Sequence, residues 1–248
     1  VRDSRLSSEA ACAGCHEFEF PSAARRAHPD KMQLTITEHA ASEFASASCQ
    51  TCHMPKVTPK AGAAGAPHVD HSFAASRDQA MLAKAVRIRA ERPSPTRVTL
   101  TLSPGEVGHA FPTGDLFRRI VLVVATSKEP SDRDAAGTSS RRVLMRRFRD
   151  VTTGQGTTIR VPSVDDRIGA PGKPRARTFE FAIAPEASHR TAEWRIEYER
   201  AEMPATSSTL AEIEERIVVA RGTLAAPSFD AKHEHDDDEN VRMTEKTR

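Results

Sequence analysis

Hydrophobic and polar residues alternate with a period of two through much of the chain between residues 81 and 225. Successive side chains of a strand point to opposite faces, so runs of this kind predict β-strands with one buried face. The alternating apolar positions are Val86/Ile88, Val98/Leu100/Leu102, Ile120/Leu122/Val124, Phe179/Phe181/Ile183 and Trp194/Ile196/Tyr198. Several short runs separated by Pro, Gly and charged turns predict an antiparallel β-sandwich over residues 81–227.

A helix is expected near the end of this region. Leu210, Ile213 and Ile217 are spaced to share one helix face, and residues 209–212 have the sequence of a capping box. A strand-like apolar run over residues 217–220 follows or overlaps that helix. Beyond it, residues 228–248 are charged and poor in apolar side chains, which predicts a disordered tail.

Residues 1–80 lack the alternation and differ in composition. They are rich in Ala, Ser and His, and they hold all four cysteines and six of the ten histidines. A segment with so few apolar residues can hardly build a core of its own. Short helices are expected after residues 7–9 and over residues 35–47, with a flexible Gly- and Ala-rich loop over 61–67. The predicted fold class is therefore α+β: a small segment of helices and loops, followed by the β-sandwich.

Two five-residue motifs carry the most specific chemistry. Residues 12–16 read CAGCH and residues 49–53 read CQTCH, and each is the C-x-x-C-H signature of c-type haem attachment. The two thiols add across the vinyl groups of one porphyrin, and the following histidine turns under the ring to bind the iron. The predicted attachment residues are Cys12, Cys15, Cys49 and Cys52, and the predicted proximal ligands are His16 and His53. The sequence thus predicts two covalently attached haem c groups.

Two other uses of C-x-x-C pairs fit this sequence less well than haem. Four cysteines can hold zinc, but the pairs of such sites usually lie about 15–20 residues apart, and Cys15 and Cys49 are further apart. Zinc also needs no histidine directly after each pair. A thioredoxin-like redox motif needs one pair inside a βαβ pattern, which is not recognisable here. Spacing and the trailing histidines favour haem.

The ligand on the far side of each iron decides what a haem protein can do, because a second His or Met closes the iron and an open position permits catalysis. His71 follows the predicted flexible loop, and His109 lies in a turn, residues 108–114, between two predicted strands. The predicted distal ligands are His71, His109, His68 and Met32, with His28 and His39 as weaker candidates and His189, His233 and His235 expected on the surface. Which ligand serves which haem stays open.

Composition narrows the possible partners and location. The formal net charge of +2 is small and arginines are spread along the chain, so nucleic acid is not an expected partner. The longest apolar run, residues 120–125, has strand length, whereas a membrane span needs about 20 residues. Haem c is attached outside the cytoplasm in bacteria, and the start at Val1 fits a chain whose signal peptide has been removed. We therefore expect a periplasmic or extracellular, cell-surface protein with redox proteins as partners.

Beyond the two attachment motifs, further short elements form a pattern. These are Met32-Gln33-x-Thr35, the extension of the second motif into Met54-Pro55, His71-Ser72-Phe73, Gly108-His109-x-Phe111-Pro112-Thr113-Gly114-Asp115 and Arg118. The pattern resembles that of multihaem cytochromes c related to the cytochrome c554 group, over roughly residues 9–120. The resemblance implies electron transfer, with His71 and His109 as distal ligands. This chain has two attachment motifs and so resembles a dihaem member.

Three functions are compatible with these features. The first is an electron carrier with two closed haems. The second is a dihaem enzyme such as a peroxidase, which would need an open iron and acid–base residues, for which Glu17, Glu38 and His39 are available. The third is a subunit of a larger or filamentous cytochrome assembly, homo- or hetero-oligomeric, because the predicted β-sandwich is far larger than two haems require. The number of possible distal ligands favours the carrier over the enzyme.

Overall fold

The computed structural model describes residues 8–19, 31–58, 65, 67–127, 139–202 and 212–227. Its helices are α1 (Ala10–His16), α2 (Thr35–Ala40), α3 (Cys49–His53) and α4 (Gln79–Lys84), with a 3-10 turn at Pro185–Ala187. The short N-terminal strands are β1 (Glu17–Glu19), β2 (Lys31–Leu34), β3 (Lys56–Val57) and β4 (His68–Val69). The longer strands are β5 (Val86–Ser94), β6 (Arg97–Pro104), β7 (Arg118–Thr126), β8 (Ser139–Leu144), β9 (Arg146–Thr152), β10 (Thr158–Asp165), β11 (Arg177–Ala182), β12 (Ala192–Ala201) and β13 (Ile213–Leu224).

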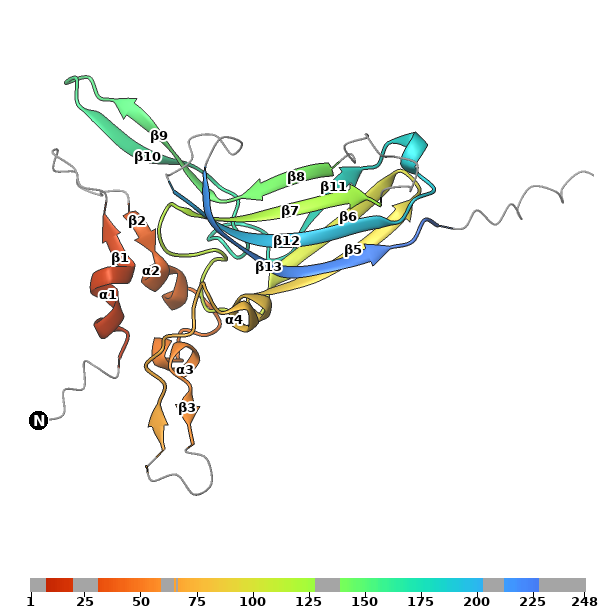
Figure 1. Cartoon of the computed structure of the whole chain (residues 1–248). Helices are drawn as coiled ribbons and strands as arrows, with labels where there is room; N and C mark the ends of the chain where they lie inside the picture. Colours follow the sequence, from red (N-terminus) through yellow and green to blue (C-terminus); the bar gives the residue numbers. More distant parts are fainter. Residues whose placement is uncertain are drawn as a thin grey trace, which may run out of the picture.

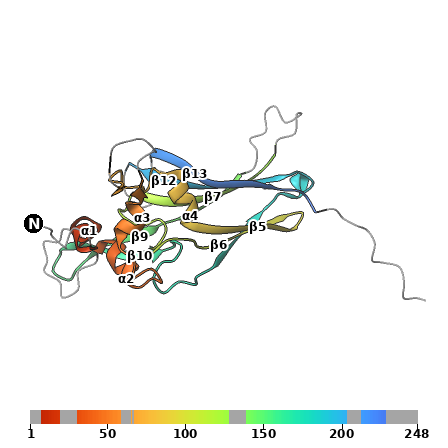
Figure 2. The same ribbon diagram turned by 90° about the horizontal axis from the view of Figure 1, so that it is seen from below.

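Two antiparallel sheets form the body of the molecule (Figure 1). One has the strand order β11-β6-β5 and the other the order β13-β12-β7-β8. Figure 2 shows them as two layers, with the helices gathered at one end of the sandwich. A two-stranded hairpin, β9–β10, extends from the same end. The predicted α+β class and the predicted antiparallel sandwich are confirmed.

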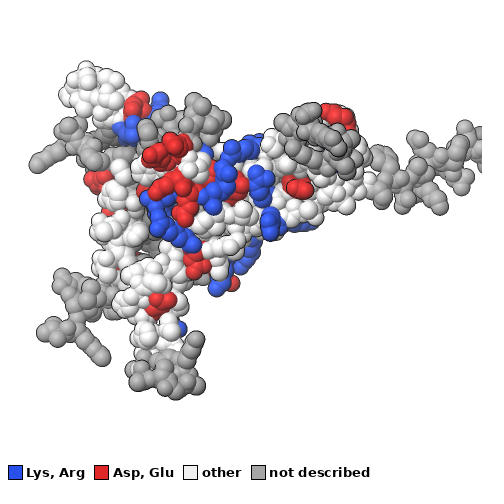
Figure 3. Space-filling view, viewed as in Figure 1, with Lys and Arg blue, Asp and Glu red and all other residues white. Residues whose placement is uncertain are grey.

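The core lies between the two sheets and is built from the alternating positions of the sequence. Leu100 and Leu102 on β6 face Ile120 and Leu122 on β7, and all four side chains are fully buried. The opposite face of the four-stranded sheet is polar. Figure 3 shows acidic and basic side chains interspersed over it. On the same face Glu199 is fully buried and pairs with Arg119 on the neighbouring strand.

The N-terminal part has a different interior. Among its described residues before Leu82, only Gln33 and Glu38 are buried, and both are polar. The first apolar side chains to be buried, those of Leu82 and Ala85 at α4, belong to the core of the sandwich. The helices and short strands of this part therefore enclose no apolar protein core, as its composition predicted.

The prediction of a helix around Leu210 is wrong for residues 213–217, the part of it that the structure describes. Residues 213–224 form strand β13, paired with β12 from Ala192↔Leu224 to Ala201↔Ile213. The β-branched run 217–220, which predicted a strand, decides the conformation, because it completes the ladder of a long neighbouring strand. Residues 209–211, the predicted loop residues 61–64 and 66, and the predicted tail 228–248 lie outside the described residues.

The helix predicted over 35–47 is shorter than expected. It ends at Ala40, and turns follow it. The Ser42 hydroxyl donates to the carbonyl of His39 and accepts from the amide of Phe44, so a side chain competes with the helical backbone bonds. The helix predicted after residues 7–9 is confirmed as α1, but Glu9 occupies its N-cap without a side-chain capping bond.

Strands β8, β9 and β10 are not among those that the alternation predicted. Only Leu144 among their residues is buried, and β8 and β9 are rich in arginine. Charged edge strands of this kind are common at sheet margins, where they prevent pairing with other chains. In the described part of the chain no helix has the length and apolarity needed to cross a membrane.

Candidate functional site: a cavity shared by both haem motifs

A cavity of about 300 Å³ lies where the N-terminal part meets the end of the sandwich. Its walls come from α1, α2, α3, the segment around Phe73 and the turn 106–114 between β6 and β7. The apolar lining includes Ile36, Phe44, Phe73, Met81, Leu82, Val107 and Phe111. Phe73 is 55 % exposed and has a positive φ of 55°. A porphyrin ring bound in this cavity would cover apolar side chains, such as Phe73, that are exposed to solvent in this structure.

Both motifs contribute to this cavity. Cys12 and His16 line it from α1, and Cys49, Cys52 and His53 line it from α3. On a helix, residues three apart lie on one face, which is how the cysteines of each motif come to neighbour each other. The thiols of Cys12 and Cys49 hydrogen-bond each other, and burial together with Cys12 raises the pKa of Cys49. The two motifs are therefore adjacent in space.

A backbone carbonyl orients the ring of His53. Its Nδ1 lies 2.6 Å from the carbonyl oxygen of Ala74. A carbonyl oxygen only accepts, so Nδ1 carries the proton and Nε2 keeps its lone pair. A ligating histidine is commonly held in this way, with one ring nitrogen bound to a carbonyl and the other presented to the metal.

His109 has the same arrangement. Its Nδ1 lies 3.1 Å from the carbonyl oxygen of Ala110, which again leaves Nε2 as the nitrogen with the lone pair. Burial lowers the pKa of His109, and this effect exceeds the opposite effects of the hydrogen bond with the carbonyl of Ala110 and of the charge of Glu38. The imidazole is thus neutral at neutral pH, the form that binds a metal ion.

The rings of His53 and His109 lie nearly parallel, with an interplanar angle of 9° and centres 6.3 Å apart. An imidazole nitrogen binds a metal ion at about 2.0–2.1 Å and lies about 1.1 Å from its own ring centre, so two imidazoles on opposite sides of one ion have centres about 6.3 Å apart. The two rings are therefore spaced as two imidazoles bound to one metal ion would be.

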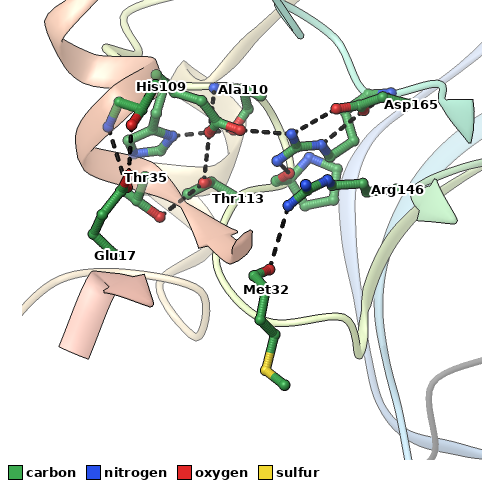
Figure 4. A network of polar contacts seen from close by, with 12 residues as sticks. Glu17, Met32, Thr35, His109, Ala110, Thr113, Arg146 and Asp165 are labelled. Carbon is green, nitrogen blue, oxygen red and sulfur yellow. Dashed lines mark hydrogen bonds and ion pairs between the residues drawn. The ribbon is translucent and has the colours of Figure 1, made fainter. Parts of the chain in front are cut away.

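The other predicted ligands lie elsewhere. His68 and His71, at and after β4, are exposed and do not line the cavity. Met32 on β2 offers its carbonyl to Arg146, and its thioether points away from the neighbouring polar network (Figure 4). His28, His233 and His235 lie outside the described residues, and His189 is exposed as expected.

His39 is a weaker candidate that the structure brings into the cavity. Its ring packs on Gly108, where an added Cβ would lie 2.8 Å from its Cδ2, and its Nδ1 is 3.5 Å from Glu9. The close approach of α2 to Gly108 places the turn that carries His109 directly against the N-terminal part. Only a glycine at position 108 permits this contact without a shift of the ring.

Arg118 forms part of the wall near His16. Its Nε donates to Asp115 at 3.2 Å and its Nη1 donates to the hydroxyl of Tyr198 at 3.0 Å. Burial lowers the pKa of His16, and the charge of Arg118 lowers it further. Tyr198 was predicted as a core residue of a strand, and nothing in the sequence indicated that its hydroxyl would reach the cavity.

A buried polar network holds the turn 108–114 (Figure 4). Glu38 on α2 accepts from the amide of Ala110 and the hydroxyl of Thr113, and it pairs with Arg167 beyond the end of β10. Arg167 also binds Asp165 through two nitrogens. Sequence reasoning considered Glu38 only as an acid–base residue and missed Arg167, because no local pattern connects residues 129 positions apart.

Comparisons with known proteins agree with a cytochrome fold. Neither the protein-family models nor the curated proteins compared with this sequence gave a match. Among solved structures, the fold is similar to the crystal structure of a penta-heme cytochrome c552 from Thermochromatium tepidum, with a TM-score of 0.57 and 19 % sequence identity. The match covers 89 % of this chain and 56 % of that chain, so the chain spans little more than half the length of its structural neighbour. The class of fold is therefore that of a multihaem cytochrome c structure.

Proposed function

We propose that this chain is a dihaem cytochrome c that carries electrons between redox partners outside the cytoplasm. The observation that carries the proposal is the pair His53–His109, whose ring separation of 6.3 Å matches two ligands on one iron. The second attachment motif supplies His53, and the turn of the sandwich supplies His109. Haem iron bound by two histidines accepts and releases one electron without an open coordination position.

Two features of this chain fit covalently held haem. The described N-terminal residues bury no apolar side chain before Leu82, so this part needs an apolar partner to have an interior. The cavity that both motifs share has an apolar lining, with Cys12, Cys49 and Cys52 at its wall. Walls of this kind exclude water from the ligated iron and thereby influence its reduction potential. The penta-heme neighbour supports the same class of cofactor at the level of the fold.

The first haem, attached at Cys12 and Cys15, would have His16 as its proximal ligand. Among the predicted distal ligands, His71, His68 and Met32 stay open for it, and His39, a weaker candidate, lines the cavity. His71 and His68 are exposed. Either of these two would have to approach the haem from the β3–β4 hairpin or serve a haem of another subunit.

The alternatives differ in what the structure offers them. A peroxidase-like enzyme needs a free acid or base near an open iron. Glu38 is bound by Arg167, Ala110 and Thr113, and Glu17 is bound by Lys31 and Thr37, so His39, which lines the cavity, is the one of the three predicted residues that stays compatible with this role. A subunit of a larger assembly stays compatible with the sandwich, the exposed histidines of the β3–β4 hairpin and the extended hairpin β9–β10. We propose the carrier as the basic activity and assembly as the second candidate.

The reduced optical spectrum with and without carbon monoxide tests the proposal. The wild-type protein, which should contain two haems by pyridine haemochrome assay, should show no response to carbon monoxide if both irons have two axial ligands. In His109→Ala one iron opens, so about half of the haem absorbance should shift. His189→Ala, which removes an exposed histidine, is the matched control and should behave as the wild type. An unchanged spectrum in His109→Ala would eliminate this ligand.

The same measurement separates the ligands of the first haem. The variants His39→Ala, His71→Ala, His68→Ala and Met32→Ala each remove one predicted ligand. The variant that opens the other half of the haem signal identifies the distal ligand of the haem bound by His16. If the wild-type protein itself binds carbon monoxide at one haem, that iron has an open position. This result would favour the enzyme over the electron carrier.

A further inference from the structure

Glu38 is a buried carboxylate that connects the two parts of the molecule. It lies on α2 in the N-terminal part, and its side chain is 1 % exposed. Its partner is Arg167, whose side chain is 5 % exposed and whose Nη2 lies 2.5 Å from Glu38 Oε1. Removing two charges from water is costly, and apolar residues of similar size stabilise a fold at least as well. A buried pair at this position therefore calls for a reason other than stability alone.

The contacts of the pair converge on the turn that carries His109 (Figure 4). Glu38 Oε2 accepts from the amide of Ala110 at 3.2 Å and from Thr113 Oγ1 at 2.8 Å. Arg167 Nη1 donates to the carbonyl of Pro112 at 3.2 Å. The turn is thus held at three residues directly after His109.

Ala110 links this network to the histidine. Its amide donates to Glu38, and its carbonyl accepts from Nδ1 of His109. The carboxylate therefore fixes the backbone whose carbonyl orients the imidazole. Bonds made to groups behind a ligating histidine are a general means of setting its orientation.

We propose that Glu38 is a positioning residue for His109, which it holds at ligating distance from the iron bound by His53 through the amide of Ala110 and the hydroxyl of Thr113. The inference rests on the proposed function, in which His109 is an axial ligand. Arg167 supplies the compensating charge that permits the carboxylate to be buried. In this arrangement α2 of the N-terminal part controls the position of a ligand that belongs to the sandwich.

The test compares two substitutions of the same residue in the full holoprotein. Glu38→Gln keeps a carbonyl oxygen for Ala110 and Thr113, so His109 should stay bound and the reduced protein should not respond to carbon monoxide. Glu38→Ala removes the acceptor, so His109 should be released and carbon monoxide should bind at one of the two haems, about half of the haem signal. A carbon monoxide response of Glu38→Ala equal to that of the wild type would overturn the proposal.

Glu199→Ala is the matched control. Glu199 is as buried as Glu38, with a side chain that is 0 % exposed, and it also pairs with a buried arginine, Arg119. It lies on the opposite face of β12 from Tyr198, whose side chain lines the cavity. Loss of this pair should lower stability without opening either iron. If Glu199→Ala binds carbon monoxide as Glu38→Ala does, the effect is general destabilisation and the proposal is wrong.

Thr113→Val keeps the test valid if Glu38→Ala does not fold. It removes one of the two bonds from the turn to Glu38, together with the bond between Thr113 and Thr35, and leaves the bond from Ala110. Hydrogen–deuterium exchange over residues 106–117 should become faster in Thr113→Val than in wild type, and carbon monoxide should bind faster. Unchanged exchange and unchanged binding would overturn the proposal. If His109→Ala itself leaves the spectrum unchanged, the proposed function fails; if only the Glu38 and Thr113 variants are silent, this inference fails alone.

Discussion

At the scale of single residues, backbone carbonyls determine which ring nitrogen of His53 and of His109 keeps a lone pair for a metal ion. Ala74 accepts from Nδ1 of His53, and Ala110 accepts from Nδ1 of His109. Both histidines therefore present Nε2, and both belong to short segments whose backbone is held by neighbouring elements. The two proposed ligands of one haem are thus oriented by main-chain atoms, which a change of side chain cannot remove.

Gly105 is a residue at which no side chain fits. A Cβ there would lie 2.1 Å from the carbonyl oxygen of Lys84, at the end of α4. Gly105→Ala should therefore push α4 away from the start of the turn 106–114 and lower the free energy of unfolding by about 1–3 kcal/mol. Urea denaturation followed by circular dichroism measures the change.

Gly154→Ala is the control for this prediction, because nothing lies within 4 Å of a Cβ at position 154. Its free energy of unfolding should stay within about 0.5 kcal/mol of the wild type or rise slightly. If Gly105→Ala is no less stable than Gly154→Ala, the close packing of α4 on the end of β6 is wrong.

At the scale of elements, ion pairs connect the end of β10 to the turn 108–114, which forms part of the cavity wall. Asp165 is the last residue of β10, and its carboxylate accepts from Nε and Nη2 of Arg167 at 2.9 and 2.7 Å. Arg167 then binds Glu38 on α2. One arginine therefore connects the end of the hairpin β9–β10 to a helix of the N-terminal part.

The substitution Asp165→Asn should show how much this ion pair contributes to the free energy of unfolding and over which pH range. Burial alone would raise the pKa of Asp165, but the hydrogen bonds and charge of Arg167 hold it below its usual range. A depressed pKa contributes stability that is present above the pKa of the unfolded chain, about 3.9, and is lost as the pH falls through the folded pKa. At pH 7 the variant should be less stable by about 1–3 kcal/mol.

Urea denaturation of both proteins from pH 7 to pH 3 measures this dependence. The difference between wild type and Asp165→Asn should be constant from pH 7 to about 5 and should shrink below about pH 4. Asp150→Asn is the control, since its partner Arg160 lies on the exposed hairpin β9–β10. A difference for Asp165→Asn that grows toward pH 3 would contradict the assignment.

At the scale of the whole molecule, the two parts have different sources of cohesion. The sandwich encloses a continuous apolar core from Leu82 to Val219. The N-terminal part encloses the cavity and, among its described residues, buries only Gln33 and Glu38. If haem occupies the cavity, the cofactor is structural for the N-terminal part and incidental to the folding of the sandwich.

Replacing both attachment cysteines of the second motif, Cys49→Ser with Cys52→Ser, tests this difference. The variant should lose one haem, and trypsin should then cleave at Lys31 and Lys56 in the N-terminal part while the sandwich stays intact. Limited proteolysis followed by mass spectrometry measures it. Thr51→Ala, which changes the same motif but keeps both thiols, should retain two haems and resist cleavage as the wild type does. Equal resistance of the double variant would mean that the N-terminal part has a core of its own.

Local patterns in the sequence were sufficient for the features that depend on neighbouring residues. Alternation predicted β5, β6, β7, β11 and β12, because a strand exposes one face to the core at every second residue. The two C-x-x-C-H motifs predicted the chemistry of the site within five residues each. The strand 213–224 was partly missed, because helical spacing of a few apolar residues competed with a long pairing partner that lies elsewhere in the chain.

By itself, the sequence determined that there are two haem attachment motifs, an apolar-poor segment that carries them and a β-sandwich behind them. Only the tertiary structure decided that His109, rather than His71, lies beside His53 with its ring parallel, and that Glu38 and Arg167 together hold the turn that carries His109. The physical reason is range. Attachment and alternation are set by residues a few positions apart, whereas an axial ligand pair and a buried ion pair depend on how distant segments are brought together by the packing of the whole chain.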